Sequence, residues 1–255
     1  MTHLTITAAA LGATPSLDPI DIDEDARPLH GGRGEDVTAV HPIPNMPNGA
    51  ALFLADGCST GGDGHQAAQA AITDVMMHMT LARWDPAALP RAILAADRAC
   101  AARADTGTTT LIGALIVDGQ VWLASVGDSQ AWMFGEERVE LTARQERRRV
   151  GDRIAMPEMK GPLLLNGHLV LASDGLWRSL WPEHAQRVLQ SCGRRPAAAL
   201  IDHVIDRRRE LVDDTAVIVA TRRLGLTHQV HMPPALTDWR QHDIAPLRAA
   251  ERILK

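Results

Sequence analysis

Acidic residues stand repeatedly at the ends of short apolar segments in this chain. Five such positions directly adjoin runs of Val, Ile, Leu and Ala, and they are Glu35-Asp36, Asp56-Gly57, Gly127-Asp128, Asp174-Gly175 and Asp213-Asp214. An isolated Asp-Gly pair commonly marks only a turn, but carboxylates that converge on one sheet edge do not all stay ionised without a cation. Hard divalent ions such as Mg²⁺ and Mn²⁺ prefer oxygen ligands, and glycine lets a backbone carbonyl come close enough to be one. The pattern therefore predicts a divalent-metal site.

Short apolar runs and amphipathic periods predict the elements that position these acids. Strands are expected at 37–41, 50–55, 108–117, 121–126, 131–134, 168–173 and 215–221. Apolar residues spaced by three and four predict helices over 68–79, 89–100 and 200–205. Asp118-Gly119 predicts a tight hairpin between two of the strands, because both residues tolerate positive φ. A hairpin makes the sheet antiparallel there, so the blocks of strands and helices predict an α+β layered fold rather than a doubly wound one.

Net charge, cysteine spacing and the lengths of the apolar runs exclude several kinds of binding partner and cofactor. The chain of 255 residues carries 31 acidic and 26 basic residues, a net charge of −5, which argues against binding to nucleic acid or to an anionic membrane. Cys58, Cys100 and Cys192 form no CxxC pair, so neither a zinc ribbon nor a disulfide framework is expected. The first residues lack the basic and apolar regions of a signal peptide, and the most apolar run, 111–117, is too short to span a bilayer. We therefore expect a soluble, cytoplasmic protein.

Six motifs follow one another along the chain, and they read GRGEDVTAV, ALFLADG, DTGTTTLIGALIV, LASVGDSQAW, HLVLASDGLW and DDTAVIV. Together and in this order they resemble the successive motifs of the metal-dependent Ser/Thr protein phosphatases of type 2C. The resemblance runs from about residue 30 to residue 221 and implies a four-layer αββα sandwich, in which helices flank two antiparallel sheets. It implies a catalytic domain over 1–222, followed at 223–255 by an appendage in which we expect a short helix over 244–254.

The resemblance also implies the reaction, which is hydrolysis of phosphoserine or phosphothreonine in proteins by a water activated between two Mn²⁺ or Mg²⁺ ions. Asp56 matches the ligand that bridges the two ions, and Asp128 lies where the family has a ligand for a third, weaker ion. The residues that match metal ligands, or the acidic pair that holds metal-bound water, are Glu35, Asp36, Asp56, Gly57, Asp128, Asp174 and Asp213. A phosphorylated protein is then the substrate, and a cognate Ser/Thr kinase is an expected partner.

One departure from the family pattern concerns the grip on the phosphate. The arginine that holds the phosphate in the family falls at Gly31 here. We expect Arg33 to take that role, because the glycines around it permit backbone paths closed to other residues, and Arg27 is the next candidate. The expected catalytic set is therefore Asp56, Asp174, Asp213 and Arg33.

Two further departures concern the entry to the site. The metal loop lacks the early histidine that is a proposed general acid in the family, and His65 comes several residues later, where we expect it to begin a helix. The stretch between Asp128 and Asp174 is short for the family. The flap that shapes substrate entry is therefore expected to be trimmed.

Two other functions are compatible with the sequence. The missing arginine and loop histidine favour a catalytically inert phosphatase-like module that binds a phosphoprotein or a kinase. The complete set of acids opposes it, because unpaired clustered carboxylates only cost stability. A more remote alternative is a serine hydrolase with Ser59 in a G-x-S-x-G motif, and with Asp174 and His203 as its partners. The glycines at 61, 62 and 64 delay the helix that a nucleophile elbow needs directly after Ser59.

Overall fold

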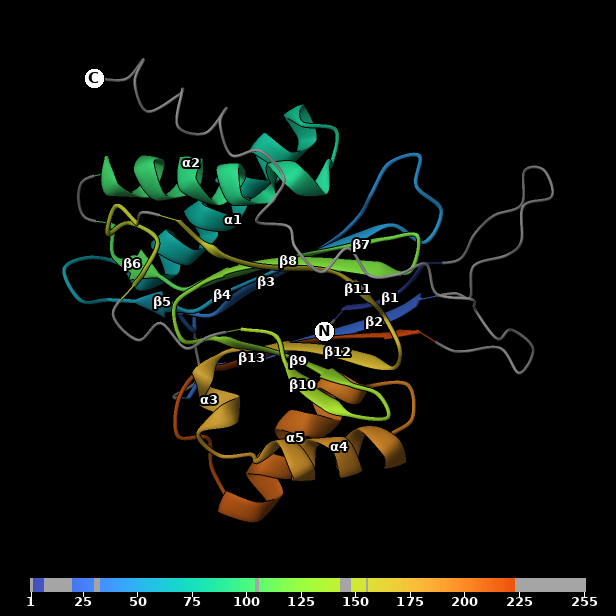
Figure 1. Ribbon diagram of the computed structural model, residues 1–255. Coiled ribbons are helices and arrows are strands. Elements are labelled where there is room, and N and C mark those ends of the chain that lie inside the picture. The colour runs from blue at the N-terminus through green and yellow to red at the C-terminus, as the bar shows by residue number, and fades with distance from the viewer. Residues whose placement is uncertain are drawn as a thin grey trace. The chain divides into compact units, whose positions relative to one another are not determined.

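Two antiparallel sheets lie face to face in the computed structural model, which describes residues 2–6, 20–29, 33–103, 106–142, 148–154 and 156–222 (Figure 1). The strands are β1 Thr2–Ile6, β2 Ile20–Arg27, β3 Val37–Pro42, β4 Ala50–Ala55, β5 Gly57–Cys58, β6 Thr108–Thr109, β7 Leu111–Val117, β8 Gln120–Val126, β9 Gln130–Phe134, β10 Arg138–Glu140, β11 Glu158–Leu164, β12 His168–Ala172 and β13 Thr215–Arg222. The helices are α1 Gly64–Leu81, the 3₁₀ turn η1 Pro86–Ala88, α2 Leu89–Ala101, α3 Asp174–Trp177, α4 Pro182–Ser191 and α5 Pro196–Arg208. The expected appendage at 223–255, with its helix over 244–254, lies outside the described residues.

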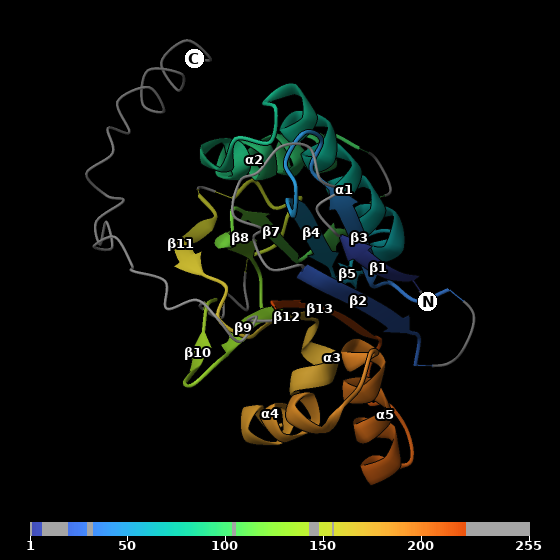
Figure 2. The same ribbon diagram turned by 90° about the vertical axis from the view of Figure 1, so that its right-hand side faces the viewer.

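The layers follow from the order of the strands and from what fills the space between them. One sheet has six strands in the order β1-β2-β13-β12-β9-β10, and the other has five in the order β11-β8-β7-β4-β3. A buried apolar cluster that includes Leu52, Ile112 and Leu171 fills the space between the two sheets. Helices α1 and α2 cover the outer face of the five-stranded sheet, and α3, α4 and α5 cover that of the six-stranded sheet (Figures 1 and 2). The fold is the α+β sandwich that the sequence predicts.

The predicted hairpin is present and sets the register of the five-stranded sheet. Val117 pairs with Gln120, and the two residues between them, Asp118 and Gly119, have φ values of 52° and 73°. Positive φ at both central positions is the requirement of a primed two-residue turn. The antiparallel arrangement that the turn imposes extends to every strand pair of both sheets.

The predicted strands are found, except that the segment 108–117 divides into β6 and β7, and the three helices predicted between residues 68 and 205 are α1, α2 and α5. The sequence analysis missed several elements. These are β1, β2, β5, β10, β11, η1, α3 and α4. Strand β2 reads IDIDEDAR, and its many acids argue against a strand by composition alone. Its alternation nevertheless directs Ile20 and Ile22 into the core between the sheets, while Asp23 on the other face accepts a hydrogen bond from the backbone of Ala197 at the start of α5, at 3.0 Å.

Helix α1, at 18 residues, is the longest one described. None of the described helices is both long and apolar enough to cross a bilayer.

Candidate metal centre

The five-stranded sheet brings three of the predicted site residues to one end. In β3 and β4 Val37 pairs with Ala55, so Asp36 and Asp56 leave the sheet side by side. In β7 and β8 Leu111 pairs with Val126, and Asp128 follows two residues later. Because antiparallel neighbours place the start of one strand beside the end of the next, the three acids share one edge of this sheet.

The six-stranded sheet contributes the other two acids from the corresponding end of its central strands. Ala172 of β12 pairs with Val217 of β13. Beyond this pair, the Ser173 backbone donates to the Ala216 carbonyl at 3.1 Å, and the Ala216 backbone donates to the Ser173 hydroxyl at 3.0 Å. Asp174 and Asp213 therefore emerge next to each other, on the side of the molecule where α3 and β5 lie in Figure 1.

The charges of these acids act on one another across the two sheets. Burial, followed by the charges of Asp36, Asp174, Asp128 and Asp213, raises the pKa of Asp56 to about 9. Burial also raises the pKa of Asp174 to about 6, and Asp128 and Asp213 add to the rise. Like charges shift one another in this way only when they are close together in a poorly solvated place. The fold thus gathers five acids that are spread over almost 180 positions of the sequence.

Asp36 shows that the gathered acids fit a cation. Both of its carboxylate oxygens are buried, and neither accepts a hydrogen bond of ordinary geometry. Burial and the charges of Asp214 and Asp174 raise its pKa to about 7, although the Ser173 hydroxyl and the Asp56 carboxyl lie near enough to oppose the rise. A buried carboxylate without a donor is costly unless a cation pairs with it. An all-oxygen donor set of this kind suits Mg²⁺ or Mn²⁺.

Gly57 and Gly64 allow the start of α1 to pack onto the loop that follows Asp56. A Cβ on Gly57 would lie 2.2 Å from the Gly64 carbonyl oxygen, and one on Gly64 would lie 2.8 Å from a Glu35 carboxylate oxygen. Such distances exclude any side chain at either position. Ser59, in the same loop, donates its hydroxyl hydrogen to Glu35. The predicted close approach of the Gly57 backbone to the acids therefore has a steric basis.

Hydroxyl side chains that the sequence analysis did not single out fix the position of Asp56. The Asp56 backbone donates to the Thr110 hydroxyl at 3.0 Å, and that hydroxyl shares a hydrogen bond of 2.7 Å with Ser129. The Thr109 hydroxyl donates to the Asp56 carbonyl at 2.9 Å. The signal for these residues was the run of three threonines that opens an otherwise apolar strand.

Asp213 and Asp214 are adjacent in sequence but make different contacts. Asp214 accepts hydrogen bonds from the backbone of Leu29 and of Glu35, each at 2.7 Å. It therefore ties the loop that carries the first acidic pair to the start of β13. Asp213, the predicted ligand, instead pairs with the guanidinium of Arg178 at 2.6 Å.

Arg178 is a second residue that the sequence analysis missed. Its guanidinium contacts both Asp174 and Asp213 at 2.6 Å, so a positive charge sits between two predicted metal ligands. Within the described ranges, no three Asp, Glu, His or Cys side chains already surround one point as metal ligands do. The acids are gathered, but two of them face an arginine.

The residues proposed to hold the phosphate or to donate a proton lie as follows. Arg33 is exposed. Arg27 is held by Asp25 at 2.7 Å and by Asp202 at 2.6 Å. His65 lies in the first turn of α1, as predicted, and its Nδ1 is 2.6 Å from the Gly34 carbonyl oxygen.

The geometry around Ser59 differs from that of a nucleophile elbow. Helix α1 begins at Gly64, five residues after the serine, and the Ser59 hydroxyl contacts Glu35 and the Gly64 backbone. A serine nucleophile needs a base such as histidine as its hydrogen-bond partner. The Ser59 environment gives no support to the serine hydrolase alternative.

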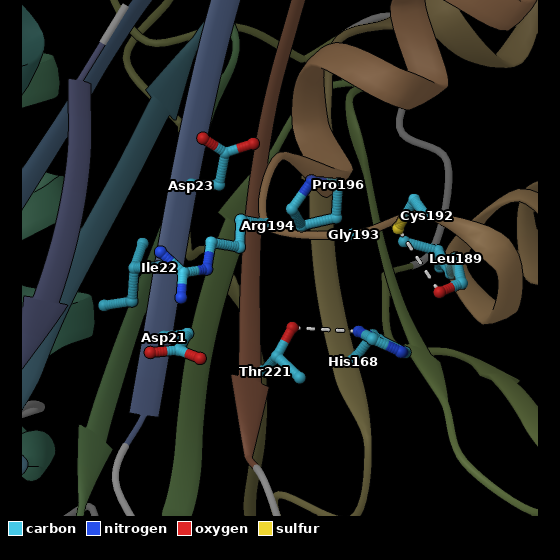
Figure 3. A pocket seen from close by; sticks show the side chains of 10 residues that line it. All are labelled: Asp21, Ile22, Asp23, His168, Leu189, Cys192, Gly193, Arg194, Pro196 and Thr221. Carbon is cyan, nitrogen blue, oxygen red and sulfur yellow. Dashed lines mark hydrogen bonds between the residues drawn. The ribbon is translucent and has the colours of Figure 1, made fainter.

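A cavity of about 220 Å³ lies away from the acids, between the outer face of the six-stranded sheet and the loop from α4 to α5 (Figure 3). His168 and Thr221, which are hydrogen-bonded at 2.9 Å, line it from the end of β12 opposite Asp174. Asp23 and Cys192 in its wall already contact the Ala197 backbone and the Leu189 carbonyl. None of the predicted site residues lines this cavity.

Comparison with known proteins gives one consistent answer. No protein-family model and no curated protein matches the sequence, but solved structures match the fold. The catalytic domain of the serine threonine protein phosphatase PstP, in complex with two manganese ions, has a TM-score of 0.66 and 21% identity over 79% of this chain and 97% of that chain. The serine/threonine phosphatase Stp1 from Staphylococcus aureus has a TM-score of 0.66 and 17% identity over 85% of this chain and 100% of that chain. The PPM Ser-Thr phosphatase MsPP from Mycobacterium smegmatis, in complex with cacodylate, has a TM-score of 0.66 and 17% identity over 79% of this chain and 98% of that chain. The chain therefore has the fold of the bacterial PPM-type, or type 2C, Ser/Thr phosphatases.

Proposed function

We propose that this protein is a metal-dependent protein-serine/threonine phosphatase. The observation that carries the proposal is the gathering of Asp36, Asp56, Asp128, Asp174 and Asp213 at one edge, where burial and mutual repulsion raise the pKa of three of them. Strong pKa shifts of this kind are typical of functional sites. The fold of solved Ser/Thr phosphatases, one of them with two manganese ions, supports the same assignment.

The proposed cation ligands and the chemistry they support follow from the family resemblance and from the positions of the acids. Asp56 and the Gly57 carbonyl would hold one Mn²⁺ or Mg²⁺ ion, Asp56 with Asp174 and Asp213 a second, and Asp128 a third, weaker one. Bound cations of this class lower the pKa of water and neutralise the charge of phosphate oxygens.

The surrounding chain would keep these acids in place. Thr109 and Thr110 fix the backbone of Asp56, and Asp214 fixes the backbone of Glu35, so that the Glu35-Asp36 pair faces the site. Preorganised ligands of this kind are what a metal site needs from its second layer of contacts.

The finer parts of the proposal concern the substrate and the setting. A phosphorylated protein is the proposed substrate, because the solved structures of this fold are named as Ser/Thr phosphatases. A cognate Ser/Thr kinase as a partner and a location in the cytoplasm belong to the same proposal, and both come from the sequence.

The test is hydrolysis of a phosphoserine peptide and of an aryl phosphate, each with Mn²⁺ and with a chelator. We expect release of phosphate with Mn²⁺ and none after exhaustive chelation. Ser59→Ala is the matched control for the hydrolase alternative, and its phosphatase activity should remain. Turnover that survives the chelator but is lost in Ser59→Ala would overturn the proposal.

A second candidate, an inert binding module, is favoured by one specific observation. Arg178 already neutralises Asp174 and Asp213, as an internal counter-ion could do in a protein that binds no metal. Such a module would bind a phosphopeptide without Mn²⁺ and release no phosphate under any metal condition. The same assays therefore separate it from the enzyme.

A further inference from the structure

The loop of residues 148–154 is fastened beside the acids by a dense set of backbone contacts. Asp97 of α2 is 1% exposed, and its carboxylate accepts hydrogen bonds from the backbone of Gly151 at 2.8 Å and of Arg153 and Ile154 at 3.0 Å. Hydrogen bonds to a buried carboxylate are charge-assisted and strong. The loop is therefore held in one conformation, although it contains no helix and no regular strand.

The point of attachment lies next to Asp56. Val150 forms an isolated bridge with Thr109, in which each backbone donates to the carbonyl of the other at 2.8 and 3.1 Å. Thr109 is also the residue whose hydroxyl donates to the Asp56 carbonyl at 2.9 Å. The residue directly before Val150 is Arg149, which is half-buried. Two hydrogen-bonded steps therefore link Val150, the residue next to Arg149, to the backbone of Asp56.

The charge of Arg149 acts on both sides of that cluster. The pKa of Asp174, which belongs to the six-stranded sheet and is raised mainly by burial, is lowered in part by Arg178 and Arg149. The pKa of Cys58, in the loop beside the five-stranded sheet, is lowered mainly by its hydrogen bond to Thr60 and in part by Arg149. The guanidinium is therefore close enough to both sheet ends for its charge to act on a group at each.

Other arginines near the site are engaged or exposed. Arg27 is paired with two aspartates, Arg178 is paired with Asp174 and Asp213, and Arg33 is exposed. In the part of the chain that the structure describes, Arg149 forms no ion pair and no side-chain hydrogen bond. Among the described residues this half-buried cation has no hydrogen-bond partner, and it lies on a loop that Asp97 holds in place close to the acids.

We propose that Arg149 is the residue that binds the phosphate group of the substrate. The inference rests on the proposed function, and it assigns to Arg149 the role that the sequence suggested for Arg33. A guanidinium offers paired donors that match two phosphate oxygens. The hydrogen bonds of Val150 and Asp97 hold the 148–154 loop in place before the substrate binds, and this lowers the entropy cost of binding.

The experiment measures binding and turnover separately. Inorganic phosphate is titrated into the Mg²⁺-loaded full-length protein by calorimetry, and hydrolysis of the phosphoserine peptide is followed in parallel. We expect Arg149→Ala to weaken phosphate binding by about 10- to 100-fold, the range for a charge-assisted contact, and to raise KM for the peptide. Arg149→Gln, which keeps most of the side-chain length, should weaken it similarly, and Arg149→Lys should recover part of the loss.

Matched controls separate a phosphate contact from other effects. Arg148→Ala removes an exposed arginine from the same loop and should leave phosphate binding unchanged. Mn²⁺ affinity should change far less in Arg149→Gln than phosphate affinity does, because Arg149 acts on Asp174 only through its charge and forms no ion pair with it among the described residues. A loss of Mn²⁺ affinity in Arg149→Gln equal to the loss of phosphate affinity would refute a direct phosphate contact.

The remaining outcomes decide the inference independently of the proposed function. Wild-type phosphate affinity in both Arg149→Ala and Arg149→Gln would overturn it, even if the protein is an active phosphatase, and so would a loss found only in Arg33→Ala. Weak phosphate binding by the two Arg149 variants, in a protein without turnover, would support the inference and contradict the enzymatic function. A wild-type protein that binds no phosphate would overturn both.

Discussion

Replacement of Arg178 by glutamine should tighten the binding of divalent cations. The Arg178 guanidinium contacts Asp174 and Asp213, both at 2.6 Å, and a cation that uses these carboxylates must first displace it. The side chains of Arg178 and Asp213 are 56% and 44% exposed, so that contact resembles a surface ion pair, and the contact with Asp174, which is 18% exposed, is partly buried but shares the same exposed guanidinium. Surface pairs contribute about 0.2–1 kcal/mol each. Release of two such pairs corresponds to an affinity for Mn²⁺ that is about 2- to 30-fold higher in Arg178→Gln.

Removal of Arg178 also favours protonation of Asp174, which opposes cation binding at low pH. The gain in Mn²⁺ affinity should therefore depend on pH. Burial raises the pKa of Asp174 to about 6, and Arg178 limits that rise. Without Arg178 the pKa of Asp174 should lie higher, so that at pH 6 more of the carboxyl is protonated and unable to bind a cation. The gain in Mn²⁺ affinity should therefore be largest at pH 8 and smaller at pH 6.

Calorimetric titration of Mn²⁺ into the wild-type protein and into Arg178→Gln, at both pH values, measures this effect. Arg187→Gln is the matched control, because it removes the same charge from an exposed position on α4 and should leave the affinity unchanged. An affinity in Arg178→Gln that is equal to or weaker than that of the wild-type protein at pH 8 would refute the reasoning. Arg178 would then act as a support for the acids rather than as a competitor of the cation.

Three further predictions follow from the site and its supports. Asp56→Asn should lower turnover by several orders of magnitude with the fold retained. Asp63→Asn is the control and should not lower turnover, because asparagine can still cap α1 where Asp63 accepts from the Gln66 backbone. Near-normal turnover in Asp56→Asn at saturating Mn²⁺ would contradict the assignment. The pKa values of about 7 for Asp36 and about 9 for Asp56 exceed the ordinary 3.8, so their contribution to the stability of the metal-free protein is present below about pH 4 and is lost as the pH rises through about 7 and 9. Thermal melts in chelator between pH 5 and 9 should show this fall, and it should vanish with Mn²⁺; an identical slope in the Asp36→Asn variant would argue against the cause. Asp97→Asn keeps one oxygen that accepts from Gly151 and Arg153, but it places an amide nitrogen against the Ile154 backbone donor and should cost about 1–3 kcal/mol. Faster amide hydrogen exchange at the 148–154 loop is the expected readout, and unchanged exchange is the contrary result.

The sequence could predict where the acids meet because local patterns determine it. Each acid directly adjoins an apolar strand, and the Asp118-Gly119 turn makes the pairing antiparallel. Once strands such as β3 and β4 pair in opposite directions, the residue before one and the residue after the other must lie at the same edge. Hydrophobic pattern and turn chemistry are both readable without the structure.

The missed strand β2 shows where local patterns fail. Its acids have low strand propensity, and their cost is met by partners from distant parts of the chain. Asp23 receives the Ala197 backbone at 3.0 Å, and Asp25 receives Arg27, which also reaches Asp202 of α5. Contacts separated by more than 170 positions leave no trace in a short window of sequence.

The residues around the acids were missed for the same reason. Arg178 looks like any exposed helix-end arginine until β13 brings Asp213 beside it. Arg149 lies in a run of three arginines, which resembles an ordinary solvated stretch. Only the contacts of Val150 with Thr109 and of Asp97 with the following backbone place it near the site.

Other acids of the fold receive hydrogen bonds from the backbone, and this contrast is the strongest argument for a cation at the sheet edge. Asp97 receives three backbone hydrogen bonds and Asp214 receives two from Leu29 and Glu35, so each of these acids is neutralised by fixed donors of the chain. Asp36 receives none of ordinary geometry on either oxygen, and Asp56 is surrounded by the charges of other acids. The fold thus supplies Asp97 and Asp214 with fixed donors and leaves both oxygens of Asp36 without one. A bound cation supplies the missing partner, and this is why the acid cluster favours a metal-dependent enzyme over an inert module.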